Sequence, residues 1–196
     1  MGRRHARQVF MPNLYVFPGG RVDRSDARIS AASPLRADVM ARLRQSGASA
    51  ARAHALAVAA VRETFEEAGL IVGASRERGR RSVAAPWRGF LDQGLAPALA
   101  GLSYIFHAIT PPGEPRRFNT RFFMARAEEV PLAGTLESRS ELADVRWVPI
   151  EEALGLPIPW VTGEVLKHVR GVLSGAAPDA VPFYRRQRGR DIYGSE

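Results

Sequence analysis

The segment that most constrains this chain is an alanine-rich run that ends in RETFEEAGL, Arg62 to Leu70. Alanine is the strongest helix former, and it fills much of the sequence before Arg62. Ser49 is a suitable N-cap, and Gly69 suits the left-handed residue at which many helices end. The sequence therefore predicts one long helix that starts after Ser49 and ends at Ala68.

Three glutamates, Glu63, Glu66 and Glu67, lie close together near the end of this helix. At about 100° per residue they share one arc, and apolar side chains occupy the other side. Like charges at this spacing repel, and the helix dipole prefers cations at this end. A bound divalent cation would reverse both penalties, and oxygen ligands suit Mg²⁺ or Mn²⁺ better than zinc. The alternative is an acidic surface helix that binds nothing.

The amino-acid composition limits which class of protein this chain can be. The 196 residues are 45% apolar and 24% charged, as in a globular domain that can bury a proper core. No apolar run approaches the roughly 18 residues of a membrane span, and no apolar N-terminal stretch predicts a secretory signal. The absence of cysteine excludes disulfides and thiolate metal sites. We therefore expect a cytoplasmic protein.

The formal net charge of +8 raises the question of nucleic acid. All of the 28 basic residues except Lys167 are arginine, and they are spread along the whole chain. Neither a clustered basic patch nor a nucleic-acid motif is present, so a nucleic-acid partner is not expected.

Strand and helix patterns alternate along the chain. The sequence predicts extended structure over 9–20 and a loop over 21–38. Helices are predicted over 37–47, 151–156 and 160–175. Strands are predicted over 70–74, 101–110, 116–127 and 144–150. The two strands before and after the PPGEP segment are expected to pair antiparallel. Residues 182–196 form a basic tail. This alternation predicts an α/β or α+β sandwich.

PGG at 18–20 followed by RETFEEAGL resembles the Nudix hydrolase family, whose signature is G-x5-E-x7-R-E-U-x-E-E-x-G-U with U aliphatic. The residues in register are Arg62, Glu63, Glu66, Glu67, Gly69 and Leu70, while Thr64 takes an aliphatic position. The first glutamate departs from the signature. His54 lies at its spacing from Arg62, and Asp26 at its spacing from Gly20. We interpret this as a segment of about 27–53 inserted into the motif, so that Asp26 or Asp23 replaces the glutamate, or nothing does.

The split motif, together with TPPGEPRRFNTRFFMA, resembles the branch that includes the coenzyme A diphosphatases. The resemblance implies an α/β (α+β) fold, a Nudix-type α/β/α sandwich with a mixed central sheet, as a single domain over 1–196. Such folds usually have a strand just before the arginines of GRR at 2–4, so a truncated or misassigned start is expected. Many relatives are dimers, which implies a homodimer.

By resemblance, the activity is divalent-metal-dependent hydrolysis of a nucleoside diphosphate linked to another moiety, through attack of water on phosphorus. The cofactor would be Mg²⁺ or Mn²⁺, and the partner a small-molecule substrate. Coenzyme A or acyl-CoA is the first candidate, and ADP-ribose or a dinucleotide the alternative. A Nudix-like module that senses a nucleotide without cleaving it is a further alternative.

The resemblance also implies roles for individual residues. The metal ligands would be the Gly20 carbonyl, Glu63, Glu66 and Glu67. The catalytic residues would be Glu67, Arg62 as an orienting group, and a general base for which Glu141 is preferred over Glu137. The substrate-binding residues would be Arg4, Arg21, Arg116, Arg117 and Phe118, with the tail over 183–190 as a candidate contact for a 3′-phosphate. For most of these a solvated loop residue or a plain turn remains the alternative.

Overall fold

The computed structural model describes residues 1–75, 84–110, 117–128, 130–138, 141–175, 181–187 and 190–195. Its helices are η1 (Asp26–Arg28, a 3₁₀ turn), α1 (Ala37–Gln45), α2 (Ala50–Ala68), α3 (Ala85–Leu91), α4 (Ile150–Leu154) and α5 (Trp160–Leu173). Its strands are β1 (Gly2–Arg4), β2 (Tyr15–Val16), β3 (Ile71–Ser75), β4 (Leu95–Pro97), β5 (Leu102–Ile109), β6 (Asn119–Ala125), β7 (Leu132–Ala133), β8 (Leu142–Ala143), β9 (Pro182–Gln187) and β10 (Arg190–Ser195).

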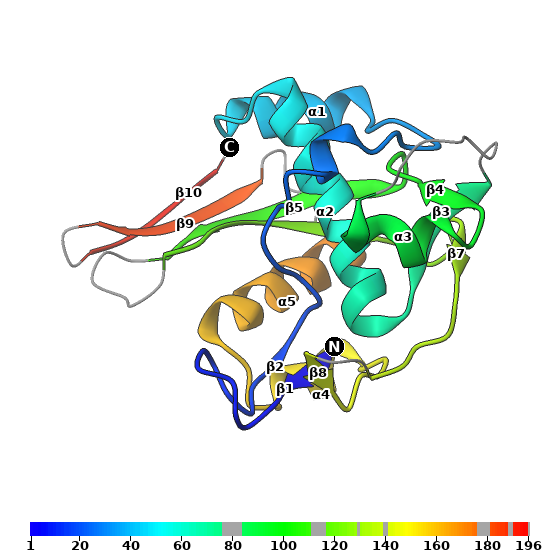
Figure 1. Ribbon diagram of the computed structural model, residues 1–196. Helices are drawn as coiled ribbons and strands as arrows, with labels where there is room; N and C mark the ends of the chain where they lie inside the picture. Colours follow the sequence, from blue (N-terminus) through cyan, green and yellow to red (C-terminus); the bar gives the residue numbers. More distant parts are fainter. Residues whose placement is uncertain are drawn as a thin grey trace.

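A mixed four-stranded sheet forms the centre of the molecule, in the order β10-β9-β5-β6. β5 runs parallel to β9 and antiparallel to β6. Helices α1 and α2 cover one face of this sheet and α5 covers the other (Figure 1). Two small sheets, β2-β1-β8 and β4-β3-β7, complete the fold. The predicted α/β sandwich with a mixed sheet is confirmed.

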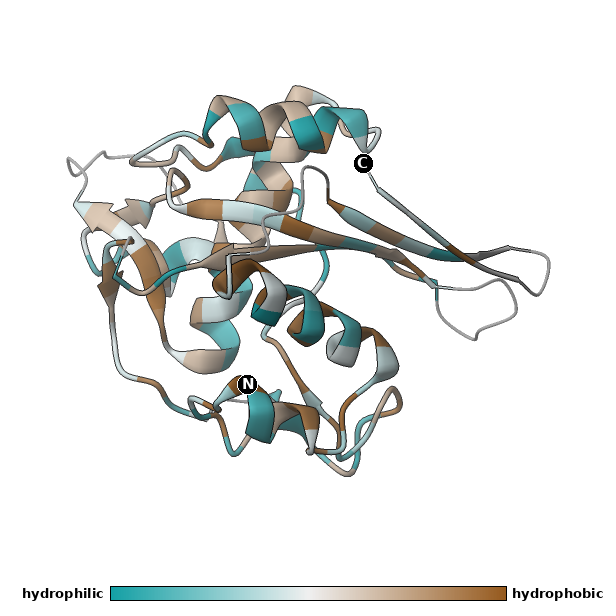
Figure 2. Ribbon diagram, turned by 180° about the vertical axis from the view of Figure 1, so that it is seen from behind, coloured by the Kyte–Doolittle hydropathy of each residue, from teal (hydrophilic) through white to brown (hydrophobic). Residues whose placement is uncertain are grey.

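Strand β5 supplies side chains to both faces of the sheet. A bulge between Tyr104 and Phe106 changes the register with β6. Tyr104 joins the larger apolar cluster beside α1, α2 and α3, whereas Ile105 and Phe106 join the smaller one with Val165 of α5. Apolar residues accordingly run along the central strands, while the helices carry polar residues on their outer faces (Figure 2). No helix in the described ranges is long and apolar enough to cross a membrane.

The helix predictions agree with the structure. Helix α2 spans Ala50–Ala68, the Ser49 side chain accepts a hydrogen bond from the Arg52 amide, and Gly69 is left-handed with φ 75°. The strands predicted before and after PPGEP pair antiparallel as β5 and β6. Local capping and periodicity were sufficient here, because these elements follow their own sequence pattern.

Two predictions about extended structure were wrong. Within 9–20 only Tyr15–Val16 is a strand, because Met11 and Asn13 have positive φ. The strand predicted over 144–150 is absent: β8 ends at Ala143, and Asp144 has φ 49°. The segment predicted as a basic tail contains the hairpin of β9 and β10, and β9 pairs with β5. The tail pairs with a strand about 75 residues away, which its local sequence does not reveal.

Gly69→Ala is expected to destabilise the protein more than Gly47→Ala. Both glycines have positive φ, 75° and 86°. A Cβ on Gly69 would lie 2.5 Å from the Thr135 carbonyl oxygen, whereas nothing lies within 4 Å at Gly47. We expect Gly47→Ala to lower the free energy of unfolding by about 1 kcal/mol through backbone strain alone. Gly69→Ala should lower it by about 1–3 kcal/mol more, because its Cβ also meets the Thr135 carbonyl. Urea unfolding measures both, and equal losses would contradict the close approach.

Candidate active site

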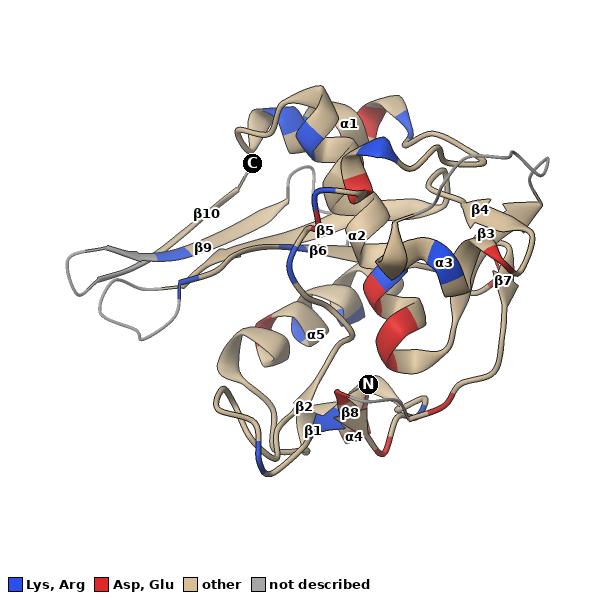
Figure 3. Cartoon of the chain, in the orientation of Figure 1, with Lys and Arg blue, Asp and Glu red and all other residues tan. Residues whose placement is uncertain are grey.

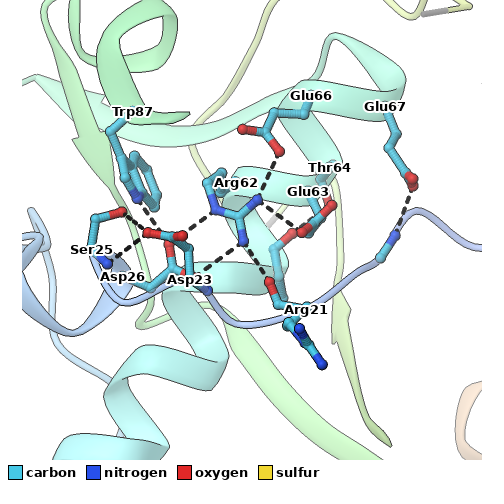
Figure 4. Close-up of polar contacts among 12 residues, drawn as sticks. Arg21, Asp23, Ser25, Asp26, Arg62, Glu63, Thr64, Glu66, Glu67 and Trp87 are labelled. Atoms are coloured by element: carbon cyan, nitrogen blue, oxygen red, sulfur yellow. Dashed lines mark hydrogen bonds and ion pairs between the residues drawn. The ribbon is translucent and has the colours of Figure 1, made fainter. Parts of the chain in front are cut away.

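The glycine turn at 18–20 lies directly against the carboxylates of α2. The Gly19 amide donates to Glu67 Oε2 at 2.8 Å (Figure 4). A Cβ placed on Gly20 would lie 2.5 Å from Glu63 Oε1. A larger residue at this position would displace the Glu63 carboxylate, so the glycine turn and the end of α2 lie in direct contact.

Arg62 connects the parts of this site and is 4% exposed. Its Nη1 donates to Glu63 Oε1 at 2.8 Å and to Glu66 Oε2 at 2.7 Å. Its Nη2 donates to the Arg21 carbonyl at 2.9 Å, and its Nε donates to Asp26. The arginine therefore orients two of the three carboxylates and holds the glycine turn against the helix.

Asp26 lies opposite Arg62 and is fully buried. It accepts hydrogen bonds from Arg62, from the Trp87 indole at 2.9 Å and from the Asp23 amide at 2.7 Å. Asp23 is turned toward Ser25 and closes the loop instead. Of the two aspartates considered for the first acidic position, Asp26 is the one that faces the arginine. Trp87 was not identified from the sequence, because only tertiary packing brings α3 to this point.

The site is electrostatically unfavourable without a cation. Burial raises the pKa of Glu67 to about 7 against the opposing Gly19 hydrogen bond, and the charges of Glu63 and Glu141 raise it further. Burial also raises the pKa of Glu63, although Arg62 opposes the shift. Acidic residues gather at the C-terminal end of α2 (Figure 3). Bound positive charge would relieve this repulsion.

The donor atoms fit a hard divalent cation. One oxygen of Glu63 and one of Glu66 accept from Arg62, and one oxygen of Glu67 accepts from Gly19. The second oxygen of each has no hydrogen-bond partner in the part of the chain that the structure describes. Oxygen donors with net negative charge suit Mg²⁺ or Mn²⁺. Among those same residues, no three acidic or histidine side chains already surround one point as a finished metal cage.

Two residues from distant segments act electrostatically on Glu67. Arg4 of β1 lowers its pKa, while Glu141, just before β8, raises it. The Arg4 Nε donates to the Phe10 carbonyl at 3.0 Å, and the Gln8 amide donates to the Glu141 carbonyl at 2.9 Å. The loop after β1 therefore holds both residues beside the carboxylates.

Other predicted site residues lie elsewhere or outside the described residues. The Glu137 amide donates to the Ala68 carbonyl beyond the end of α2. Phe118 is 41% exposed, and its ring packs against Phe10 at 5.1 Å. Arg117 beside it and the Arg21 side chain are exposed. Arg116 and residues 188–189 of the tail fall outside the described residues.

Comparisons with known proteins were made for the whole chain. No protein-family model matches it. The chain is 26% identical over 166 residues to a Caenorhabditis elegans protein named "Putative nudix hydrolase 7". The match covers 79% of this chain and 47% of that protein. The chain is 27% identical over 204 residues to the acyl-coenzyme A diphosphatase NUDT19 of Gallus gallus, covering 78% of this chain and 54% of that protein. The chain thus spans about half the length of these curated relatives.

A solved structure has the same fold. The crystal structure of a NUDIX hydrolase from Alicyclobacillus acidocaldarius superposes with a TM-score of 0.62 at 29% identity, covering 85% of this chain and 80% of that one. The fold, the named relatives and the carboxylate helix beneath a double-glycine turn agree with one another. On these findings, the chain is similar to Nudix hydrolases in both sequence and fold.

Proposed function

We propose that this protein is a divalent-metal-dependent pyrophosphohydrolase that cleaves a nucleoside diphosphate linked to another moiety. The single observation that carries the proposal is the set of carboxylates at the end of α2, close against Gly19 and Gly20. Burial raises the pKa of Glu63 and of Glu67. In each of the three glutamates one carboxylate oxygen accepts a hydrogen bond, and the other is available to a ligand. Such a site costs stability unless it binds positive charge.

In the proposed mechanism, the Gly20 carbonyl, Glu63, Glu66 and Glu67 would hold Mg²⁺ or Mn²⁺. When bound, the ion neutralises charge on the diphosphate and lowers the pKa of a water ligand. Arg62 keeps Glu63 and Glu66 in place through its Nη1. The hydrogen bonds of Glu63, Glu66 and Glu67, and the contact of Gly20 with Glu63, support these assignments.

Two further residues complete the proposed mechanism. Glu141, whose charge acts on Glu63 and Glu67, accepts the proton of the attacking water. Arg4, fixed through its Nε by the Phe10 carbonyl, directs its remaining N–H groups to the diphosphate. Arg21, Arg116, Arg117 and Phe118 remain candidate contacts for the rest of the substrate.

We propose coenzyme A or acyl-CoA as the substrate class. The named activity of the chicken relative supports it, as does the likeness of the segments around the glycine turn and PPGEP. ADP-ribose and dinucleotides remain the alternative. A non-catalytic sensing module is less favoured, because Asp26 pairs with Arg62 through both carboxylate oxygens, which supports Asp26 as the replacement for the first acidic residue of the motif. A homodimer and a cytoplasmic location stay predictions.

A substrate panel tests this proposal. The protein is incubated with Mg²⁺ or Mn²⁺ and with coenzyme A, dephospho-coenzyme A, acyl-CoA, ADP-ribose, NADH or a diadenosine polyphosphate, and the products are separated chromatographically. We expect coenzyme A to yield adenosine 3′,5′-bisphosphate and phosphopantetheine, faster than the dephospho form reacts. Turnover of ADP-ribose or dinucleotides alone would move the assignment to the alternative. No turnover of any compound with either metal would overturn the enzyme proposal.

A further inference from the structure

Trp87 is fully buried in α3, yet its only polar atom is used at the carboxylate site. The indole Nε1–H donates to Asp26 Oδ1 at 2.9 Å (Figure 4). The ring itself is held by Phe90 of the same helix, with centroids 5.2 Å apart, and Phe90 packs on Phe65 of α2 at 5.5 Å. The indole N–H is therefore presented in a fixed direction.

Asp26 receives hydrogen bonds on both oxygens. Oδ1 accepts from Trp87 and from Arg62 Nε at 3.0 Å. Oδ2 accepts from the Asp23 amide at 2.7 Å and from Arg62 Nη2 at 3.2 Å. Donors from outside the ion pair, one on each oxygen, fix the plane of the carboxylate. Arg62 must then align its Nε and Nη2 edge with that plane.

The orientation of the Arg62 guanidinium determines the direction of its Nη1 nitrogen. With Nε and Nη2 bonded to Asp26, Nη1 is the nitrogen that carries both Glu63 and Glu66. A continuous chain of hydrogen bonds thus runs from Trp87 through Asp26 and Arg62 to two carboxylates. Loss of the indole N–H would leave Asp26 with one donor fewer and Arg62 less ordered.

We propose that Trp87 is a positioning residue for the metal site, acting through Asp26 and Arg62. The inference rests on the proposed function, because it assigns Glu63 and Glu66 to the metal. Groups that orient metal ligands through hydrogen bonds typically change metal affinity by about 10–100-fold when removed. A residue that only filled the core would change stability and leave the affinity as it was.

Two substitutions separate these roles. Trp87→Phe keeps an aromatic ring and removes the N–H. Leu43→Val is the matched control, since Leu43 is equally buried, lies in α1 and makes no hydrogen bond or ring contact with Trp87, Asp26 or Arg62. Both are expected to lower the melting temperature by a few degrees, about as expected for a small cavity in a domain of this size.

The test measures Mn²⁺ binding to the metal-free protein by electron paramagnetic resonance, without substrate, and exchange of the Arg62 Nε–H by ¹⁵N NMR. We expect Trp87→Phe to weaken Mn²⁺ binding about tenfold and to accelerate this exchange, while Leu43→Val leaves both at the wild-type value. Unchanged exchange in Trp87→Phe, or equal effects in the two variants, would overturn the inference. If the wild type bound no Mn²⁺, the proposed function would fail, and the exchange rates would still decide the role of Trp87.

Discussion

Glu67→Gln is expected to lower turnover by about 10²–10⁴-fold while the protein stays folded. Glutamine keeps the shape of the side chain and can still accept from the Gly19 amide, so the glycine turn is retained. It removes the charge that the proposed metal site requires. Turnover of the best substrate from the panel, at saturating Mg²⁺ or Mn²⁺, measures the effect. Activity near the wild-type rate would remove Glu67 from the mechanism.

The same variant is expected to be more stable than the wild type in the absence of metal. The fold raises the pKa of Glu67 to about 7, from about 4.5 for an ordinary glutamate in the unfolded chain, so the folded state binds more protons than the unfolded state between these pH values. Stability of the wild type therefore falls as the pH rises from 4.5 to 7. The glutamine variant lacks this penalty and gains up to about 3 kcal/mol above pH 7.

Denaturant unfolding in EDTA at several pH values measures this gain. The two proteins should have the same stability below pH 4.5, where Glu67 is protonated, and diverge as the pH rises. A constant difference at all pH values would show that the substitution acts through packing and not through the buried charge. Loss of activity together with a gain of stability would mark Glu67 as a residue kept for function.

Asp26→Ala is expected to destabilise the protein by about 3–5 kcal/mol, the cost of breaking a buried ion pair from one side. Arg62, with 5% of its side chain exposed, would lose its carboxylate partner at Nε and Nη2. The Trp87 indole and the Asp23 amide would lose their acceptor as well. Urea unfolding measures the loss, which is large against the total stability of an ordinary domain.

Asp38→Ala is the matched control for this prediction. Asp38 also pairs with an arginine, Arg36 at 3.2 Å, but its side chain is 58% exposed. Water replaces a lost surface partner, so the expected cost is below about 1 kcal/mol. Similar losses in the two variants would mean that the Asp26 ion pair contributes no more than a surface one.

The sequence by itself determined the local parts of this protein. Helix α2 was predictable from Ser49 to Gly69, because the cap, the alanines and the left-handed glycine act within a few residues of one another. The shared face of Glu63, Glu66 and Glu67 follows from helical periodicity alone. The antiparallel pair β5 and β6 was predictable because the two strands are adjacent in sequence.

Tertiary structure decided everything that depends on contacts between distant segments. Asp26, Arg62 and Trp87 come from three separate elements, and their meeting is a result of packing. The hairpin of β9 and β10 exists because β5 offers it a partner, and Glu67 has a raised pKa because the fold removes it from water. Burial and long-range pairing are properties of the whole chain, so a local reading of residues could name the carboxylates but not the network that holds them.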